Sequence, residues 1–367
     1  MFENMTKPYL QQKAPATVVP HCMPRYKVKE LYGLEQVYKL ASNENPFGVS
    51  PLAKKAIVDA IAEAHLYSDG SREIVLKDKI AALHGYASSN VFISGGGAAV
   101  LSQLAGVFIQ PGDEVIIPSP AYPPYYLWAF RNGGTYVEVP CREKEQVMDA
   151  DAVLAAVTPR TKFCFLCNPN NPTSTAIPKA EMLRIIRGLP KTVIAVIDEA
   201  YIDFTDDPEG MTMVPEVREY PNMVVVRTFS KIYGMASVRL GYAIACGEII
   251  RYLDRSVSCR GVTTFGIEGA IAALDDVAFR EKTMENNRVE RKYLTEELTA
   301  MGYAVSPSQS NFLWVDFGRP AGDVHDDLLP YGIIIRGDFG DRARVSIGQH
   351  HENEALVEAL RKIAATH

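Results

Sequence analysis

Three groups of polar residues follow β-branched stretches of the chain. Lys231 ends the motif Thr228-Phe-Ser-Lys231, directly after the apolar segment 223–227. Asp198-Glu-Ala-Tyr201 follows segment 192–197, and Asn168-Pro-Asn-Asn-Pro-Thr173 follows segment 163–167. If these segments are strands, a lysine, a carboxylate, a tyrosine and an asparagine gather at their carboxyl ends. Open α/β sheets bind their ligands at that edge.

This set of side chains suits pyridoxal phosphate. A lysine amine can form a Schiff base with the aldehyde of that cofactor. A carboxylate can keep the pyridine nitrogen protonated, so that the ring takes up carbanion charge. A lone lysine at a strand end is most often a solvated surface charge, but three such motifs together favour the cofactor.

The same motifs, in this order, resemble fold-type I pyridoxal phosphate-dependent aminotransferases from about residue 40 to residue 348. Two segments, Lys39-Leu-Ala-Ser-Asn-Glu-Asn-Pro-Phe-Gly48 and Tyr67-Ser-Asp-Gly-Ser71, are similar to those of the histidinol-phosphate aminotransferase family. The resemblance implies an α/β fold of type I, with a large domain around a mostly parallel sheet and a smaller α+β domain. It also implies a ping-pong aminotransferase with L-histidinol phosphate as the favoured amino donor and 2-oxoglutarate as the 2-oxo acid acceptor.

The resemblance assigns roles to the motif residues. Lys231 would carry the cofactor and move the proton at the reacting carbon, and Asp198 would pair with the ring nitrogen. Asn171 and Tyr201 would hydrogen-bond the phenolic oxygen, and Tyr122 of Pro120-Ala-Tyr-Pro123 would stack on the ring.

Phosphate binding needs donors and positive charge. In the family, an arginine eight residues after the lysine clamps the cofactor phosphate, and Arg239 matches it. Thr228 and Ser230 offer hydroxyls, and the glycine-rich stretch before a predicted helix offers backbone N–H groups. Tyr67 would reach the same phosphate from the neighbouring subunit, which implies a homodimer with shared sites. The glycine-rich stretch contributes Gly96, Gly97 and Ala98.

Anionic substrates call for arginine. Arg344 matches the family's arginine for the substrate carboxylate, and Arg336 matches the position that binds a distal phosphate. Asn43 is expected beside the substrate. Pro20-His21 is the nearest match to the family's N-terminal Pro-Tyr, so His21 is expected to donate to a substrate phosphate.

The elements that must position these residues alternate in type. Strands are predicted over 114–117, 163–166, 193–197, 224–227 and 238–245, with helices over 98–109 and 179–188. This alternation indicates a largely parallel sheet covered by helices. A helix over 280–301, strands over 311–316, 333–336 and 344–347, and a helix over 353–365 predict a second domain. The expected division is 1–40 as an N-terminal arm, 41–264 as the large cofactor-binding domain and 265–367 as the small domain.

Composition excludes other classes of protein. Of the 367 residues, 47% are hydrophobic and 22% charged, which is typical of a globular chain. The net charge of −6 argues against nucleic acid as a partner. No apolar run is long enough for a membrane span, and no signal peptide is apparent, so a cytoplasmic protein is expected. The Cys164–Cys167 pair would face opposite sides of a strand, which predicts reduced core thiols and no metal.

Two alternatives stay open. The first is another reaction of the same cofactor, either transamination of an aromatic or specialised amino acid or decarboxylation of a related substrate. The second is a non-catalytic protein of the same fold, which the complete set of cofactor residues disfavours.

Overall fold

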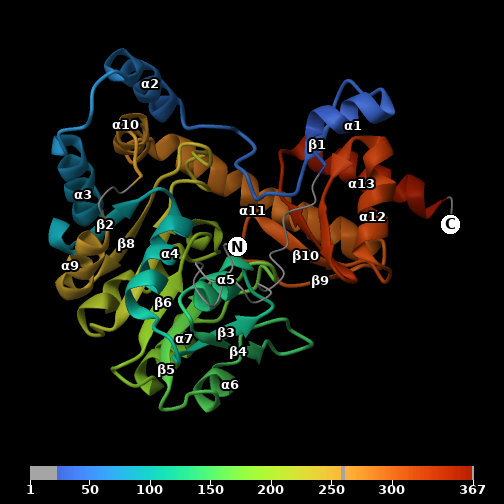
Figure 1. Ribbon diagram of the computed structural model, residues 1–367. Helices are drawn as coiled ribbons and strands as arrows, with labels where there is room; N and C mark the ends of the chain where they lie inside the picture. The colour runs from blue at the N-terminus through green and yellow to red at the C-terminus, as the bar shows by residue number, and fades with distance from the viewer. Residues whose placement is uncertain (1–22, 258–260, 366–367) are drawn as a thin grey trace, which may run out of the picture.

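The computed structural model describes residues 23–257 and 261–365. A seven-stranded sheet with its helices forms the larger part of the molecule (Figure 1). A four-stranded sheet with the C-terminal helices forms the smaller part beside it. The two-part α/β architecture predicted from the sequence is confirmed.

The large sheet has the strand order β2-β8-β7-β6-β5-β3-β4. Strands β4, β3, β5, β6 and β7 run parallel to one another, while β8 is antiparallel to both β7 and β2. The mostly parallel sheet is thus also confirmed. The strands are β2 (Val91–Ser94), β3 (Glu114–Ser119), β4 (Thr135–Pro140), β5 (Thr161–Cys167), β6 (Ile194–Asp198), β7 (Met223–Thr228) and β8 (Gly241–Ala245).

Both faces of this sheet are buried, as expected where helices cover a parallel sheet on two sides. Ala195 and Ile197 of β6 belong to one hydrophobic cluster, and Val196 between them belongs to the other. Cys164 and Cys167 likewise fall into different clusters, and both are free thiols. Among the described residues, no group of His, Cys, Asp and Glu side chains could hold a metal ion.

The helices of the large part alternate with its strands along the chain. They are α2 (Pro51–Ala60), α3 (Ser71–His84), α4 (Gly97–Phe108), α5 (Pro124–Arg131), α6 (Ala150–Ala155), α7 (Lys179–Gly188), α8 (Pro208–Met211), α9 (Gly247–Ser256) and α10 (Thr264–Ala273). Short 3₁₀ helices lie at η3 (Ile61–Glu63), η4 (Ser88–Asn90), η5 (Ile202–Phe204) and η6 (Val214–Arg218). No helix of the described residues has the length and apolarity that a membrane span requires.

The small part has its own core. Its four-stranded sheet has the order β12-β13-β10-β9, and a two-stranded sheet pairs β1 with β11. Helix α11 runs from α10 into this part (Figure 1), and α13 begins with a capping box of Gln349 and Glu352. The elements are α1 (Arg25–Tyr32), β1 (Tyr38–Lys39), α11 (Val277–Ala300), β9 (Ala304–Val305), β10 (Phe312–Asp316), α12 (Ala321–Leu328), η7 (Leu329–Tyr331), β11 (Ile333–Ile334), β12 (Arg336–Phe339), β13 (Arg342–Ser346) and α13 (His350–Ala364).

Two details differ from the sequence analysis. The strand predicted over 238–245 begins only at Gly241, because Arg239 has a φ of 62° and cannot continue a strand. Helix α10 was expected in the small domain, but its Ile267, Ala270 and Ala273 pack into the core of the large sheet. Helix α11 therefore marks the passage between the two parts.

Candidate active site

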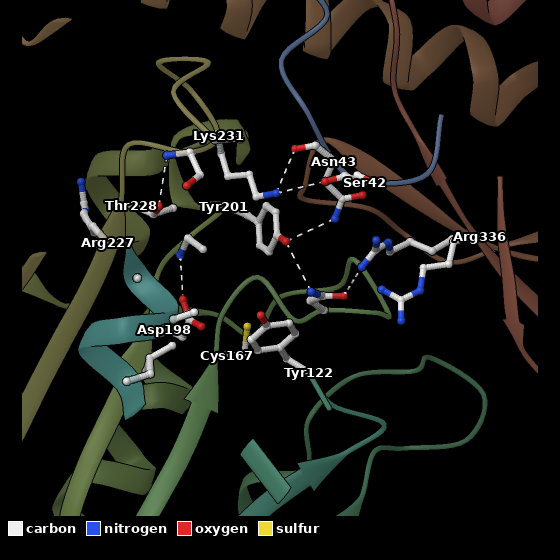
Figure 2. A pocket seen from close by; sticks show the side chains of 18 of the residues that line it. Ser42, Asn43, Tyr122, Cys167, Asp198, Tyr201, Arg227, Thr228, Lys231 and Arg336 are labelled. Atoms are coloured by element: carbon white, nitrogen blue, oxygen red, sulfur yellow. Dashed lines mark hydrogen bonds between the residues drawn. The ribbon is translucent and has the colours of Figure 1, made fainter. Parts of the chain in front are cut away.

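A cavity of about 310 Å³ opens at the carboxyl ends of β5, β6 and β7, where the small part meets the large one. The large part contributes most of its walls. The segment 41–43, which follows β1, and two arginines from β12 and β13 close the side toward the small part (Figure 2). The described lining residues that carry reactive or polar side chains are Ser42, Asn43, Tyr122, Cys167, Asn171, Asp198, Tyr201, Arg227, Thr228, Ser230, Lys231, Arg239, Arg336 and Arg344.

Lys231 projects into this cavity from the turn after β7. Its Nζ donates hydrogen bonds to the carbonyl oxygens of Ser42 at 3.2 Å and Asn43 at 3.1 Å. Burial, followed by the nearby charge of Arg344, lowers the pKa of Lys231 to about 7. Near neutral pH a large fraction of this amine is therefore unprotonated and nucleophilic.

Asp198 is the last residue of β6 and is 7% exposed. Its Oδ1 accepts a hydrogen bond from the backbone N–H of Ala200 at 3.0 Å, and its Oδ2 accepts one from the Tyr125 hydroxyl at 2.6 Å. Burial raises the pKa of this carboxyl group, and the Tyr125 bond opposes that effect. The carboxylate faces the cavity from the strand next to the one that precedes Lys231 (Figure 2).

Tyr201, Asn171 and Arg344 form one hydrogen-bonded group in the wall of the cavity. The Tyr201 hydroxyl accepts hydrogen bonds from Asn43 Nδ2 at 3.2 Å and Asn171 Nδ2 at 3.4 Å. Asn171 Oδ1 in turn accepts from Arg344 Nη1 at 2.7 Å. The group therefore joins residues from both parts of the molecule.

The far end of the cavity is a cradle for an anion. Helix α4 begins at Gly97, and the N-terminus of a helix carries partial positive charge. Gly96 has a φ of 102°, and a Cβ there would approach Arg239 Nη2 to 2.6 Å. A Cβ at Gly97 would meet the Thr228 side chain at 3.4 Å. Glycine thus brings the backbone close to a guanidinium and a hydroxyl, as phosphate binding requires.

Tyr122 lines the wall between these groups. It follows β3, and its ring makes edge-on contacts with Tyr125 at 5.5 Å and with Trp128 at 6.2 Å. These neighbours hold the Tyr122 ring at the border of the cavity, where it could cover a flat ligand (Figure 2).

Three of the expected site residues, Arg336, Tyr67 and His21, need separate comment. Arg336 lines the cavity, and its guanidinium is paired with Asp338, with Nε to Oδ1 at 2.9 Å and Nη2 to Oδ2 at 3.3 Å. Tyr67 is 103% exposed and is not among the described residues that line the cavity. His21 lies outside the described residues, so its expected role stays a prediction.

Asn43 lines the cavity but is itself fully buried. Its Nδ2 donates to the Tyr201 hydroxyl, and its Oδ1 accepts a hydrogen bond from Ser346 Oγ at 3.0 Å. Both polar atoms of the Asn43 amide therefore have protein partners.

The sequence analysis missed the hydroxyl of Tyr125 and the carbonyl group of Ser42. Tyr125 lies in the first turn of α5, three residues after Tyr122. That helical spacing was the one sequence feature that could have placed it near the site. The role of Ser42 depends on its backbone carbonyl, which no residue type reveals.

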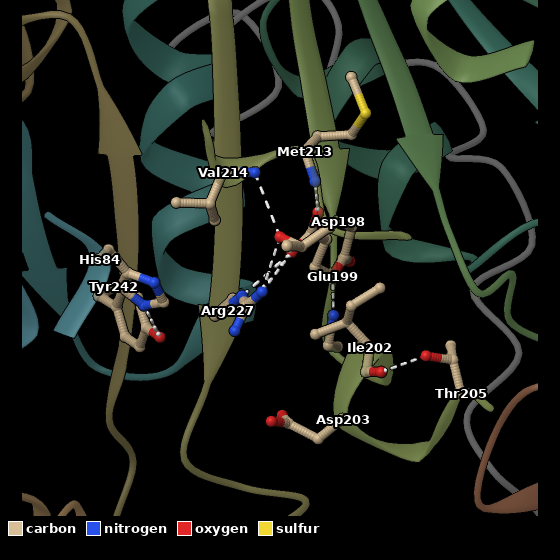
Figure 3. Close-up of polar contacts among 12 residues, drawn as sticks. His84, Asp198, Glu199, Ile202, Asp203, Thr205, Met213, Val214, Arg227 and Tyr242 are labelled. Carbon is tan, nitrogen blue, oxygen red and sulfur yellow. Dashed lines mark hydrogen bonds and ion pairs between the residues drawn. The ribbon is translucent and has the colours of Figure 1, made fainter. Parts of the chain in front are cut away.

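A largely buried ion pair connects Glu199, which directly follows β6, with Arg227 of β7, a residue that also borders the cavity (Figure 3). Glu199 Oε2 accepts from Arg227 Nη2 at 2.8 Å, and Glu199 Oε1 accepts from the Met213 backbone at 2.6 Å. The Glu199 side chain is 1% exposed. The pair links the end of β6, which carries Asp198, to β7, the strand that precedes Lys231.

The residues therefore fit each part of pyridoxal phosphate. The glycine–arginine cradle suits a phosphate group, and the carboxylate of Asp198 suits a protonated ring nitrogen. The amide of Asn171 and the hydroxyl of Tyr201 suit a phenolic oxygen. The amine of Lys231, with its lowered pKa, suits an aldehyde.

Comparison with known proteins agrees with this arrangement. The family model for aminotransferase class I and II matches residues 35–363. Histidinol-phosphate aminotransferase from Moorella thermoacetica is 38% identical over 347 residues, which cover 93% of this chain and 89% of that protein.

Two solved structures extend the similarity to the fold. Histidinol-phosphate aminotransferase from Sinorhizobium meliloti, in complex with pyridoxal-5'-phosphate, superposes with a TM-score of 0.87 at 26% identity and covers 98% of both chains. Aspartate aminotransferase from Thermus thermophilus with maleate has a TM-score of 0.83 at 26% identity, covering 98% of this chain and 99% of the other.

Proposed function

Because the chain belongs to the class I and II aminotransferase family, we propose that it transfers the amino group of L-histidinol phosphate to 2-oxoglutarate. Pyridoxal phosphate is its cofactor. The observation that carries this proposal is that a partly buried lysine of lowered basicity and a buried carboxylate face one cavity, which also contains the glycine–arginine cradle. The similarity to proteins named histidinol-phosphate aminotransferase supports the choice of donor.

When bound, pyridoxal phosphate supplies an aldehyde that links to amines and a ring that accepts the electron pair released at the reacting carbon. Asp198 would hold the proton on the ring nitrogen, and its buried position keeps that interaction out of water. Gly96, Gly97 and Arg239 would bind the phosphate group together with the hydroxyls of Thr228 and Ser230.

Lys231 would bind the cofactor and then move a proton. Its Nζ already lies between two carbonyl oxygens on the segment 42–43, so the free amine has a defined place in the cavity. Its lowered pKa allows the amine to accept a proton at one point of the reaction and to return it at another.

Two arginines would orient the substrate. Arg344 is 4% exposed and is fixed by Asn171 and by the Ala41 carbonyl at 2.7 Å. It lines the same cavity as Lys231, and its positive charge contributes to the lowered pKa of that lysine. Arg336 also borders a second cavity lined by Lys27 and His325, which leaves room for a longer substrate arm. We assign Arg344 to the anion nearest the reacting carbon, which is the α-carboxylate in glutamate. Histidinol phosphate has no carboxylate, so Arg344 and Arg336 would bind its phosphate together, with Arg336 serving the phosphorylated arm.

The active form would be a homodimer. Apolar side chains on α2, η3, α3 and the segment between η3 and α3 are exposed in the single chain, which favours a second copy as their partner. Tyr67 lies in this surface and would reach the phosphate cradle of the other subunit. The exposed residues are Leu52, Val58, Ile61, Leu66, Tyr67 and Ile74.

A half-reaction screen tests this function. Protein loaded with pyridoxal phosphate is mixed with one amino compound at a time, and the cofactor absorbance is followed. Histidinol phosphate and glutamate should each convert the bound cofactor to its amine form. A response to aromatic amino acids alone would assign another donor, and release of CO₂ would assign a decarboxylase.

A further inference from the structure

The hydroxyl of Tyr125 contacts Asp198 from a position that does not border the cavity. The O–H donates to Oδ2 at 2.6 Å, a distance typical of the strong hydrogen bonds that hydroxyl groups donate to carboxylates. Tyr125 is 1% exposed, and its ring stacks on Phe165 with centroids 4.4 Å apart and an interplanar angle of 10°. A rigid donor is therefore fixed against one oxygen of the carboxylate.

The surroundings of Asp198 make the Tyr125 hydroxyl important for the pKa of that carboxyl group. Burial raises the pKa of Asp198, and the neighbouring Glu199 raises it further. The Tyr125 hydrogen bond is the largest effect in the opposite direction, followed by the Ala200 N–H. The titratable groups that interact with the carboxylate from the surrounding elements are Tyr122, Tyr125, Cys167, Glu199, Tyr201 and Lys231.

A proton held between a carboxylate and a pyridine nitrogen goes to the more basic partner. A hydrogen bond donated to the carboxylate makes that carboxylate less basic. The proton then stays on the nitrogen, where it strengthens the ring as an electron acceptor. Loss of the donor would move the proton toward Asp198.

We propose that Tyr125 is a positioning residue that acts through Asp198, aiming the carboxylate at the cofactor nitrogen and keeping the proton on that nitrogen. The inference rests on the proposed function, because it requires bound pyridoxal phosphate. It adds a residue outside the cavity to the groups that determine the reactivity of the cofactor.

The test compares Tyr125→Phe with Tyr126→Phe. Phenylalanine at 125 retains the stack on Phe165 and removes only the hydroxyl. Tyr126 is the next residue of α5, and its hydroxyl donates to Glu138 at 3.3 Å, so Tyr126→Phe is the matched control. Each protein is loaded with pyridoxal phosphate labelled with ¹⁵N in the ring, and the ¹⁵N NMR signal is followed against pH. Asp198→Asn gives the reference for a ring without its anionic partner.

In the parent and in Tyr126→Phe, the signal should be that of a protonated ring nitrogen around neutral pH. In Tyr125→Phe it should shift toward the unprotonated position and lose its proton at lower pH. The rate of cofactor conversion by the amino donor should fall about tenfold or more, the usual effect of a hydrogen bond to a charged group.

An unchanged ¹⁵N signal in Tyr125→Phe would overturn the inference, even if the activity of that variant fell. Equal shifts in Tyr125→Phe and Tyr126→Phe would overturn it as well. If the parent protein binds no pyridoxal phosphate, the proposed function fails and this inference fails with it. If the parent protein binds the cofactor and reacts with the amino donor, the proposed function stands. The ¹⁵N comparison then tests only the role of Tyr125.

Discussion

Arg344 donates a hydrogen bond from Nη1 to Oδ1 of Asn171 at 2.7 Å, although 173 positions separate the two residues in the chain. Arg344 lies on β13 of the small sheet, and Asn171 follows β5 of the large one. This contact connects the arginine assigned to the substrate with the hydrogen bonds around Tyr201. The residues assigned to the substrate and to the cofactor therefore belong to one buried hydrogen-bond network.

Arg344→Ala should slow the half-reactions with both histidinol phosphate and glutamate. The change removes a buried charge-assisted partner, which costs about 2–5 kcal/mol, or roughly thirtyfold to four-thousandfold in rate. Single-turnover rates with each donor measure the effect. Loss with one donor and not the other would contradict the assignment of Arg344 to the reacting end.

Arg336→Ala should mainly slow the reaction with the phosphorylated donor. Arg336 lies at the start of β12, where Asp338 holds its guanidinium at the cavity wall, and we assign it to the distal phosphate. The expected result is a loss of about tenfold or more with histidinol phosphate and a smaller loss with glutamate. If Arg336→Ala reacts with histidinol phosphate as fast as the parent, the choice of that donor is wrong.

The capture of cofactor by the apo protein should depend on pH through Lys231. Only the unprotonated amine is nucleophilic, and the pKa of Lys231 is lowered to about 7, chiefly by burial. The rate of attachment should therefore be nearly constant above pH 7 and fall about tenfold per pH unit below it. Stopped-flow absorbance over a pH series measures this rate. A rate that continues to rise to about pH 10 would indicate an ordinary, exposed lysine.

Tyr67 tests the shared sites of the proposed dimer. Lys231→Ala and Tyr67→Phe proteins, each of low activity, are mixed under conditions that allow subunit exchange. If Tyr67 serves the partner's cofactor, one site of each mixed dimer carries both changes and the other carries neither, so activity should rise above both parents. Exchange without a gain in activity would place Tyr67 in the site of its own chain or outside any site.

The sequence predicted the residues that follow strands more fully than the contacts between distant segments. Asp198, Asn171 and Lys231 could be found because apolar strands end just before them, and their motifs are short and continuous. The Arg344–Asn171 bond could not be predicted, because it depends on how the two sheets pack together.

Other features were hidden for different physical reasons. The carbonyl groups that accept hydrogen bonds from Lys231 belong to the backbone of segment 42–43. The identity of the side chains there therefore could not predict these contacts. The Tyr125 hydroxyl contacts Asp198 across 73 positions. Helix α10 is apolar enough for either domain, and only its packing against α2 and α3 decides where it belongs.

Reduction of the cofactor-loaded protein with borohydride, followed by peptide mass spectrometry, tests the central claim most directly. The reagent fixes pyridoxal phosphate to the amine that carries it, and Lys231→Ala serves as the control. The account predicts one labelled peptide, with the cofactor on Lys231, and no label in the control. A label on another lysine, or a control that is still labelled, would contradict the assignment of Lys231.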